Sequence, residues 1–154
     1  GEEPYTLALL FAFGETLSGC RPEIFATDAD PHLLQRARRA CYPETSLRDL
    51  PERWRAAFEP FGDEHCLSAE YRTPVRFLEH DIRHAFPESH FDLILCRNLV
   101  FTYFATALQA EIARRLVERL VPEGVLVLGI HESLPESVPM LAQERPWLYR
   151  KPEE

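Results

Sequence analysis

Lysine is nearly absent from this sequence, because Lys151 is the only one and all other basic side chains are arginines. The 17 basic residues are outnumbered by 25 aspartates and glutamates, which gives a formal net charge of −8. Nucleic-acid affinity depends on basic patches that release counterions, and no such run of basic residues occurs here. The composition therefore disfavours a nucleic-acid partner.

Long hydrophobic runs and metal-binding spacings are also lacking. No apolar stretch reaches the about 18 residues that span a bilayer, so membrane insertion is not expected. No C-x-x-C pair and no zinc-binding spacing occur among the six histidines and the four cysteines, Cys20, Cys41, Cys66 and Cys96. We therefore expect no metal site and reduced thiols in a cytoplasmic protein, with Cys41 in a helix and Cys96 in a strand.

The sequence does contain alternating strand and helix patterns. Helices are expected at 2–13 and 106–121, and a third begins at Pro31 with Asp30 as its N-cap. Four prolines divide residues 42–74 into short pieces, for which we predict short helices and then a weak hairpin around 66–71. Apolar runs predict strands at 24–27, 75–78, 91–96 and 124–130, with a closing strand at 147–150.

These strands are continuous apolar runs, which is typical of a parallel sheet covered by helices on both faces. The length of 154 residues suits one α/β domain. Ligands of such sheets bind at the carboxyl ends of the strands. Polar residues follow four of the predicted strands: Asp28, Asp81, Arg97 with Asn98, and His131 with Glu132.

Asp28 directly follows the first predicted strand, where a carboxylate can accept hydrogen bonds from both hydroxyls of a ribose. A turn-shaping role is an equally good interpretation of Asp28, whereas a cap is the favoured role of Asp30. His80 and Asp81 are placed to flank an adenine ring, with the carboxylate accepting from its exocyclic amine. A solvated strand end is the simpler interpretation of that pair.

Several segments together resemble the chemotaxis methyltransferase (CheR) family, in the order in which that family has them. The most specific are Gly-Glu-Glu-Pro-Tyr at 1–5, Ala-Thr-Asp-Ala-Asp at 26–30 and Phe-Asp-Leu-Ile-Leu-Cys-Arg-Asn at 91–98. The resemblance covers essentially the whole chain. It implies a Rossmann-like class I methyltransferase fold, mostly parallel with an antiparallel C-terminal strand.

The resemblance further implies S-adenosylmethionine as cofactor, with S-adenosylhomocysteine as product. The implied reaction is esterification of glutamate side chains on chemoreceptor helices, so the expected partner is a bacterial protein substrate. A small β-subdomain at 62–74 would tether a receptor tail. The implied positions of the cofactor residues are Glu2 or Glu3 near the methionine part, Asp28 at the ribose, Asp81 at the adenine, and Arg97 with Asn98 in the reaction cleft.

Methyl transfer to a carboxylate needs no strong base, because the nucleophile is already ionised at neutral pH. Arg97 is expected to attract the substrate carboxylate and a tyrosine hydroxyl to orient it. One extra residue precedes Tyr103 when compared with the family pattern. Either a loop absorbs the insertion and restores the hydroxyl of Tyr103, or Thr102 takes its place. The family turn Gly-His-Ser-Glu-Ser is also altered here, at 129–133.

The family places a central strand and a small-residue loop before the Gly-Glu-Glu-Pro-Tyr segment, whereas this sequence begins at Gly1. Neighbours of an absent strand would lose backbone hydrogen-bond partners. We therefore expect weak or absent cofactor binding by these 154 residues alone, or an oligomer in which another chain completes the sheet.

Two functions stay open at this point. The first is a glutamate methyltransferase or a relative with another carboxylate substrate. The second is a degenerate, non-catalytic domain with a regulatory or protein-binding role, which the displaced Tyr103 favours. A nicotinamide-dependent oxidoreductase is disfavoured because no G-x-G-x-x-G occurs.

Overall fold

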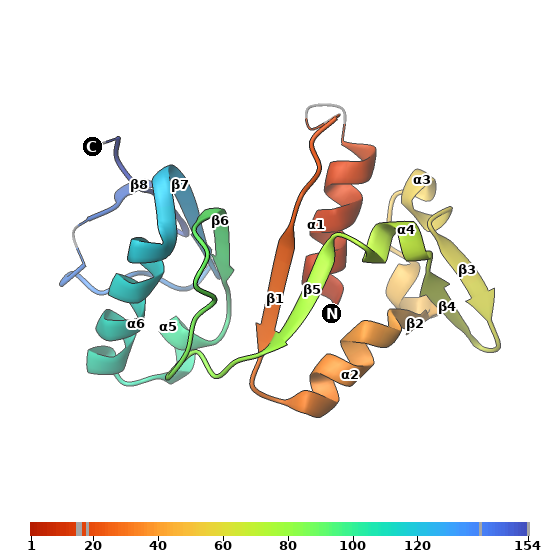
Figure 1. Cartoon of the computed structure of the whole chain (residues 1–154), viewed down its shortest axis with the longest axis horizontal. Helices are drawn as coiled ribbons and strands as arrows, with labels where there is room; N and C mark the ends of the chain where they lie inside the picture. The colour runs from red at the N-terminus through yellow and green to blue at the C-terminus, as the bar shows by residue number, and fades with distance from the viewer. Residues whose placement is uncertain (15–16, 18, 139, 154) are drawn as a thin grey trace. The chain divides into compact units, whose positions relative to one another are not determined.

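The computed structural model describes residues 1–14, 17, 19–138 and 140–153 (Figure 1). The chain divides into two compact units, Gly1–Ala85 and Phe86–Glu154. In the described residues, the first unit holds a two-stranded and a three-stranded sheet, and the second holds a four-stranded sheet. A single domain over residues 1–154 stays a prediction.

The helices of the first unit begin and end close to their sequence signals. Helix α1 covers Glu2–Phe13 and α2 covers Pro31–Arg39, as predicted. Asp30 caps α2, because its Oδ1 accepts a hydrogen bond of 2.8 Å from the backbone N–H of His32. The remaining short helices are a 3-10 turn at Glu44–Leu47, α3 at Glu52–Arg55 and α4 at Ala69–Arg72.

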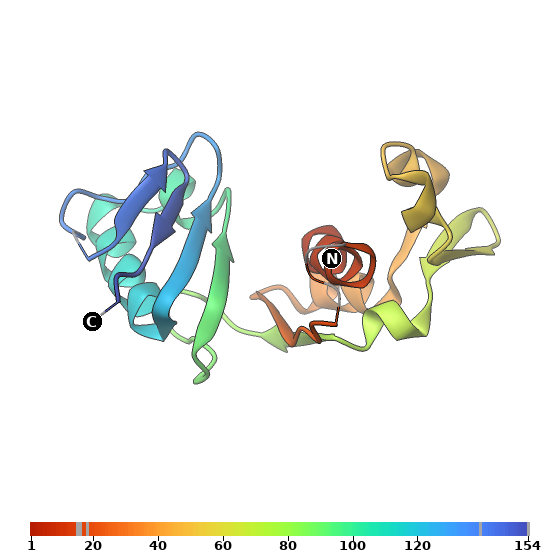
Figure 2. The same ribbon diagram turned by 90° about the horizontal axis from the view of Figure 1, so that it is seen from above.

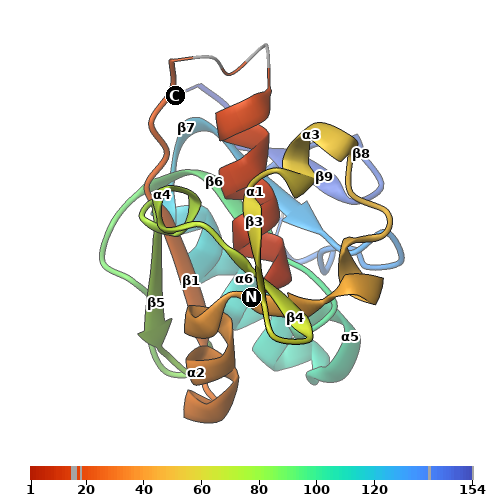
Figure 3. The same ribbon diagram turned by 90° about the vertical axis from the view of Figure 1, so that its right-hand side faces the viewer.

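Strands β1 (Ile24–Asp28) and β5 (Val75–Glu79) pair in parallel, with Asp28 opposite Glu79 at their carboxyl ends. Helix α1 lies beside α3 and α4 (Figure 3). Its residues Tyr5 and Leu9 are buried in an apolar cluster with Trp54 and Leu67. The Tyr5 hydroxyl donates to the carbonyl of Ala37 over 2.9 Å, which ties α1 to the end of α2.

The three-stranded sheet corrects the prediction for residues 42–74. Its order is β2 (Cys41–Pro43), β4 (Glu64–Leu67) and β3 (Phe58–Phe61), all antiparallel. The hairpin expected around 66–71 is wrong in position, because the chain turns earlier, at Gly62, whose φ is +60°. Pro60 disfavours a strand, but β3 lies at the sheet edge, where proline is tolerated.

Cys41 and Cys66 form a disulfide in this sheet, so the expectation of reduced thiols is wrong for this pair. Cys41 lies on β2 and not on a helix, directly opposite Cys66 on β4. The next pair of opposite residues, Ala40 and Leu67, is joined by a hydrogen bond from the N–H of Leu67 to the carbonyl of Ala40. The cysteines therefore occupy the non-hydrogen-bonded position, where antiparallel strands approach most closely.

The second unit is a mixed sheet with the order β6-β7-β9-β8. Strands β6 (Phe91–Cys96) and β7 (Leu120–Leu128) are parallel, whereas β9 (Leu148–Arg150) and β8 (Ala142–Arg145) add antiparallel. The predicted closing strand is therefore present. Helix α6 (Thr106–Arg119) packs on this sheet (Figure 2), and α5 (Val100–Tyr103), like β8, has no counterpart in the prediction.

Strands β1 and β6 are less buried than their apolar sequences predict. None of the five residues of β1 is fully buried, and β6 buries only Cys96. Within the described part of each unit, both strands lie at a sheet edge with a partner on one side only. Leu93 on β6 is accordingly 40% exposed. Both strands are therefore only partly buried among the described residues.

Candidate functional site

The residues predicted for the site occur in both units. Glu2, Glu3, Asp28 and Asp81 belong to the first unit, and Arg97, Asn98 and Tyr103 belong to the second. Within each unit, polar groups gather at the carboxyl ends of parallel strands, which is the usual ligand-binding edge of an α/β sheet.

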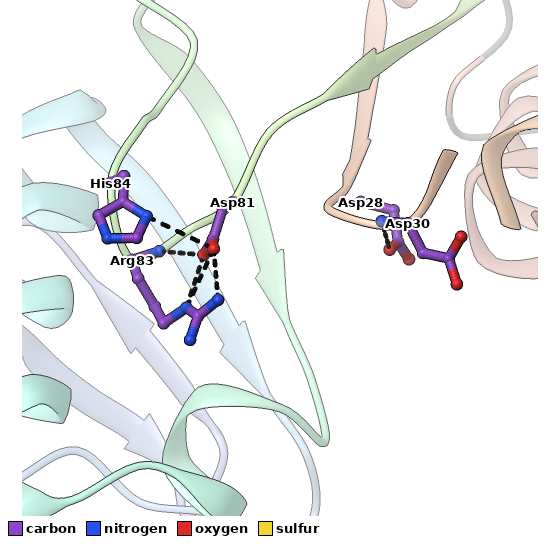
Figure 4. A network of polar contacts seen from close by, with 5 residues as sticks. All are labelled: Asp28, Asp30, Asp81, Arg83 and His84. Carbon is purple, nitrogen blue, oxygen red and sulfur yellow. Dashed lines mark hydrogen bonds and ion pairs between the residues drawn. The ribbon is translucent and has the colours of Figure 1, made fainter. Parts of the chain in front are cut away.

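Asp28 ends β1 and shapes the turn into α2. Its Oδ1 accepts a 2.9 Å hydrogen bond from the backbone N–H of Asp30 (Figure 4). Its Oδ2 makes no hydrogen bond within the described residues. The turn-shaping interpretation is thus confirmed, and the second oxygen is left available. This fits a role in holding ribose hydroxyls, which stays a prediction.

Asp81 follows β5 and is already engaged by basic side chains (Figure 4). The guanidinium of Arg83 approaches both carboxylate oxygens at 2.6–3.0 Å, and the Arg83 backbone N–H donates to Oδ1 over 2.9 Å. His84 Nδ1 lies 3.4 Å from Oδ2. The hydrogen bonds from Arg83 hold the pKa of Asp81 well below its usual range. An adenine amine would have to share these oxygens with Arg83, so the fit of Asp81 to the predicted role is weaker than that of Asp28.

Replacing Arg83 with glutamine is expected to raise the pKa of Asp81 towards the ordinary value of about 3.9. In the wild type the lowered pKa stabilises the fold above the unfolded-state pKa, and this contribution disappears as the pH falls through the folded-state pKa. Carboxyl-carbon NMR titration of Asp81 measures the change. The control R76Q removes an arginine that pairs with Glu23 instead and should leave Asp81 unchanged. An Asp81 titration that is the same in R83Q and wild type would contradict the assignment.

Glu2 and Glu3 lie exposed in the first turn of α1. Carboxylates there interact favourably with the positive end of the helix dipole. This placement explains both residues without a ligand, and their predicted position near the methionine part of the cofactor stays a prediction.

In the second unit, Glu132 joins the ends of β6 and β7. It is the one buried polar or charged side chain among the described residues, with 5% exposure. Its Oε2 accepts from the backbone N–H of Asn98 over 2.8 Å and from that of Gly129 over 2.7 Å. Its Oε1 accepts from the Thr102 hydroxyl over 2.6 Å. A single carboxylate therefore connects β6, β7 and α5.

Burial by itself raises the pKa of Glu132, but hydrogen bonds outweigh that effect. The hydroxyl of Thr102 and the backbone N–H groups of Asn98, Gly129 and Leu99 together lower the pKa. The buried side chain is therefore a carboxylate at neutral pH.

The same turn places Thr102 and Tyr103 in different environments. The Thr102 hydroxyl is committed to Glu132, whereas the Tyr103 side chain is 75% exposed. Arg97, at the end of β6, is also exposed. Of the two alternatives for the tyrosine position, this arrangement favours Tyr103 as the group able to meet a ligand.

The sequence did not indicate Arg83 as a partner of Asp81, and it did not indicate that Thr102 and Glu132, both singled out above, bond to each other. The Asp-x-Arg spacing at 81–83 was a usable signal for the first. Glu132 follows a predicted strand, but its partners Thr102 and Asn98 lie 30 and 34 residues away, and no local pattern indicates them. In the part of the chain that the structure describes, no group of three or more His, Cys, Asp or Glu side chains could hold a metal ion. No described helix has the length and apolar character to cross a membrane.

The sequence matches known proteins over most of its length. The family described as CheR methyltransferase, SAM binding domain, matches residues 1–146. The chemotaxis protein methyltransferase of Listeria innocua is 37% identical over 136 residues, which cover 87% of this chain and 50% of that protein. The Escherichia coli chemotaxis protein methyltransferase is 32% identical over 143 residues, covering 86% and 49%. The chain thus spans about half the length of these curated relatives.

The fold is similar to that of a solved methyltransferase. The N-methyltransferase NodS from Bradyrhizobium japonicum, in complex with S-adenosyl-L-homocysteine, matches with a TM-score of 0.52 at 16% identity. The match covers 99% of this chain and 87% of NodS. Together with the parallel pairs β1–β5 and β6–β7 and the antiparallel C-terminal strands, this confirms the predicted class I methyltransferase architecture.

Proposed function

The chain belongs to the CheR methyltransferase family as its SAM-binding domain, and on that premise we propose that it transfers methyl groups from S-adenosylmethionine to glutamate carboxylates of chemoreceptors. The observation that carries the proposal is the family match over residues 1–146. That range includes Asp28, Asp81, Arg97, Asn98 and Tyr103. Family membership itself confirms what the sequence segments predicted.

When bound, S-adenosylmethionine would supply a methyl group whose carbon an ionised carboxylate can attack without a base, with S-adenosylhomocysteine as the leaving group. The residues of this chain then have to bind the cofactor and the acceptor carboxylate and align them for the transfer. In the proposal, Asp28 accepts hydrogen bonds from the ribose hydroxyls through its available Oδ2. Arg97 attracts the acceptor carboxylate, and the exposed Tyr103 hydroxyl donates to it. No proton changes hands, so alignment supplies most of the rate.

The test uses the protein as naturally encoded, tritiated S-adenosylmethionine and receptor signalling fragments. A glutamate ester releases labelled methanol in mild base, so base-labile label on the receptor is the expected result. A receptor fragment with glutamine at its acceptor glutamates serves as control. Base-stable label would identify another acceptor. Binding of S-adenosylhomocysteine without any transfer would favour the degenerate, non-catalytic function, and no binding would overturn the proposal.

Replacing Tyr103 with phenylalanine is expected to lower kcat by roughly three- to tenfold, the value of one hydrogen bond to the acceptor. Affinity for S-adenosylhomocysteine should stay the same, because the hydroxyl is assigned to the substrate. Kinetics with the receptor fragment measure the change. The matched control T102S keeps the hydroxyl that Glu132 accepts from and should retain the wild-type kcat. An unchanged kcat in Y103F would show that Tyr103 is not used.

A further inference from the structure

We propose that Glu132 is a positioning residue, whose buried carboxylate fixes the turn after β6 and thereby orients Arg97 and Tyr103 for methyl transfer. The proposal rests on the proposed function for its kinetic consequence. Its structural part stands on the hydrogen bonds of the second unit alone.

The first argument is the cost of burying Glu132. A carboxylate at 5% exposure is unfavourable unless hydrogen bonds replace its lost hydration. The hydrogen bonds that replace this hydration come from three places in the chain: the N–H groups of Asn98 and Gly129 and the hydroxyl of Thr102. Charged hydrogen bonds of this kind contribute more than neutral ones. Oε2 accepts two of these bonds and Oε1 the third, so losing all of them would leave a buried carboxylate without partners among these groups.

The second argument is the backbone of Asn98. Its φ of +55° lies in the left-handed region, which costs free energy in a non-glycine residue, although asparagine adopts it more readily than most. Glu132 holds the Asn98 N–H from one side. A Cβ at Gly129 would meet Asn98 Oδ1 at 2.5 Å and Glu132 Oε2 at 2.7 Å, so a larger residue there would have to displace these two side-chain atoms. Glu132 thus holds the backbone of the turn, and Gly129 leaves room for the Asn98 side chain.

The third argument is adjacency in sequence. Arg97 directly precedes Asn98, and Tyr103 directly follows Thr102. Both residues assigned to the acceptor carboxylate are thus direct neighbours of residues that hydrogen-bond to Glu132, Arg97 through the backbone of Asn98 and Tyr103 through the side chain of Thr102. Misplacement of a reacting group by about 1 Å can cost on the order of 100-fold in rate. Glu132 is itself buried with both oxygens occupied, which suits an indirect role better than contact with substrate.

The test compares E132Q and E132A, with E136Q as a matched control for loss of charge at an exposed residue nearby. Glutamine keeps an oxygen for the two N–H groups, and its amide can donate to the Thr102 hydroxyl. A positioning role therefore predicts that E132Q keeps kcat within about threefold of wild type, whereas E132A loses on the order of 100-fold. The KM for S-adenosylmethionine should change little, and E136Q should match wild type.

Three results would overturn the proposal. If E132Q loses as much kcat as E132A, Glu132 acts chemically. If E132A melts lower but its folded form keeps the wild-type kcat, Glu132 only stabilises the fold. If E132A does not fold, T102V decides, because it removes only the bond to α5: reduced kcat supports positioning, and wild-type kcat refutes it.

Amide hydrogen exchange gives a readout that does not depend on catalysis. In E132A, exchange at Asn98 and Gly129 should accelerate at least about tenfold relative to other amides of β6 and β7, whereas T102V keeps both of these bonds and should leave it unchanged. Unchanged exchange at the two amides in E132A would overturn the proposal. If the wild type transfers no methyl group, the proposed function fails, and exchange at these two amides still decides whether Glu132 fixes the turn.

Discussion

Replacing Asp28 with asparagine is expected to weaken S-adenosylhomocysteine binding between about tenfold and about 100-fold. Hydrogen bonds to a charged group are worth about 1.5–3 kcal/mol, and an amide nitrogen at the Oδ2 position cannot accept from a ribose hydroxyl. Asparagine still offers Oδ1 to the N–H of Asp30, so the turn into α2 is preserved. The loss would therefore report on the ligand and not on the fold.

Calorimetric titration of the protein as naturally encoded measures this effect. The matched control is D30A, which lies in the same turn and removes the cap of α2. Loss of that cap costs about 1 kcal/mol of stability but leaves both oxygens of Asp28 in place. Equal loss of affinity in D28N and D30A would mean that the turn, and not the carboxylate of Asp28, matters for binding.

Removing the Cys41–Cys66 disulfide is expected to destabilise the first unit by about 3 kcal/mol. The bond joins residues 25 positions apart, so its loss returns considerable freedom to the unfolded chain. It also joins β2 to β4 in a small sheet whose Leu67 lies in the core with Tyr5 and Leu9. The double variant C41S/C66S should unfold at a lower urea concentration than wild type.

Urea unfolding with and without reductant tests this prediction. Reductant should shift wild type towards the double variant and leave the double variant unchanged. C20S is the control, because the exposed Cys20 is outside the disulfide. If reductant shifts C41S/C66S as much as wild type, or shifts neither, the two thiols are not paired in solution.

Local signals in the sequence determined the regular elements and the family. Asp30 followed by Pro31 set the start of α2, Gly14 the end of α1, and continuous apolar runs gave β1, β5 and β6. The polar residues at strand ends and the segments at 1–5, 26–30 and 91–98 sufficed to recognise a CheR methyltransferase. These features lie within a few neighbouring residues, so their physical causes can be read from the chain alone.

Only the tertiary structure decided which distant groups meet. Cys41 and Cys66 pair because β2 and β4 align in one register, and Glu132 is buried because the ends of β6 and β7 converge on it. The partial burial of β1 and β6 likewise depends on which distant segments pack against each strand. Such pairings are set by the path of the whole backbone, which the amino-acid pattern of any one segment does not contain.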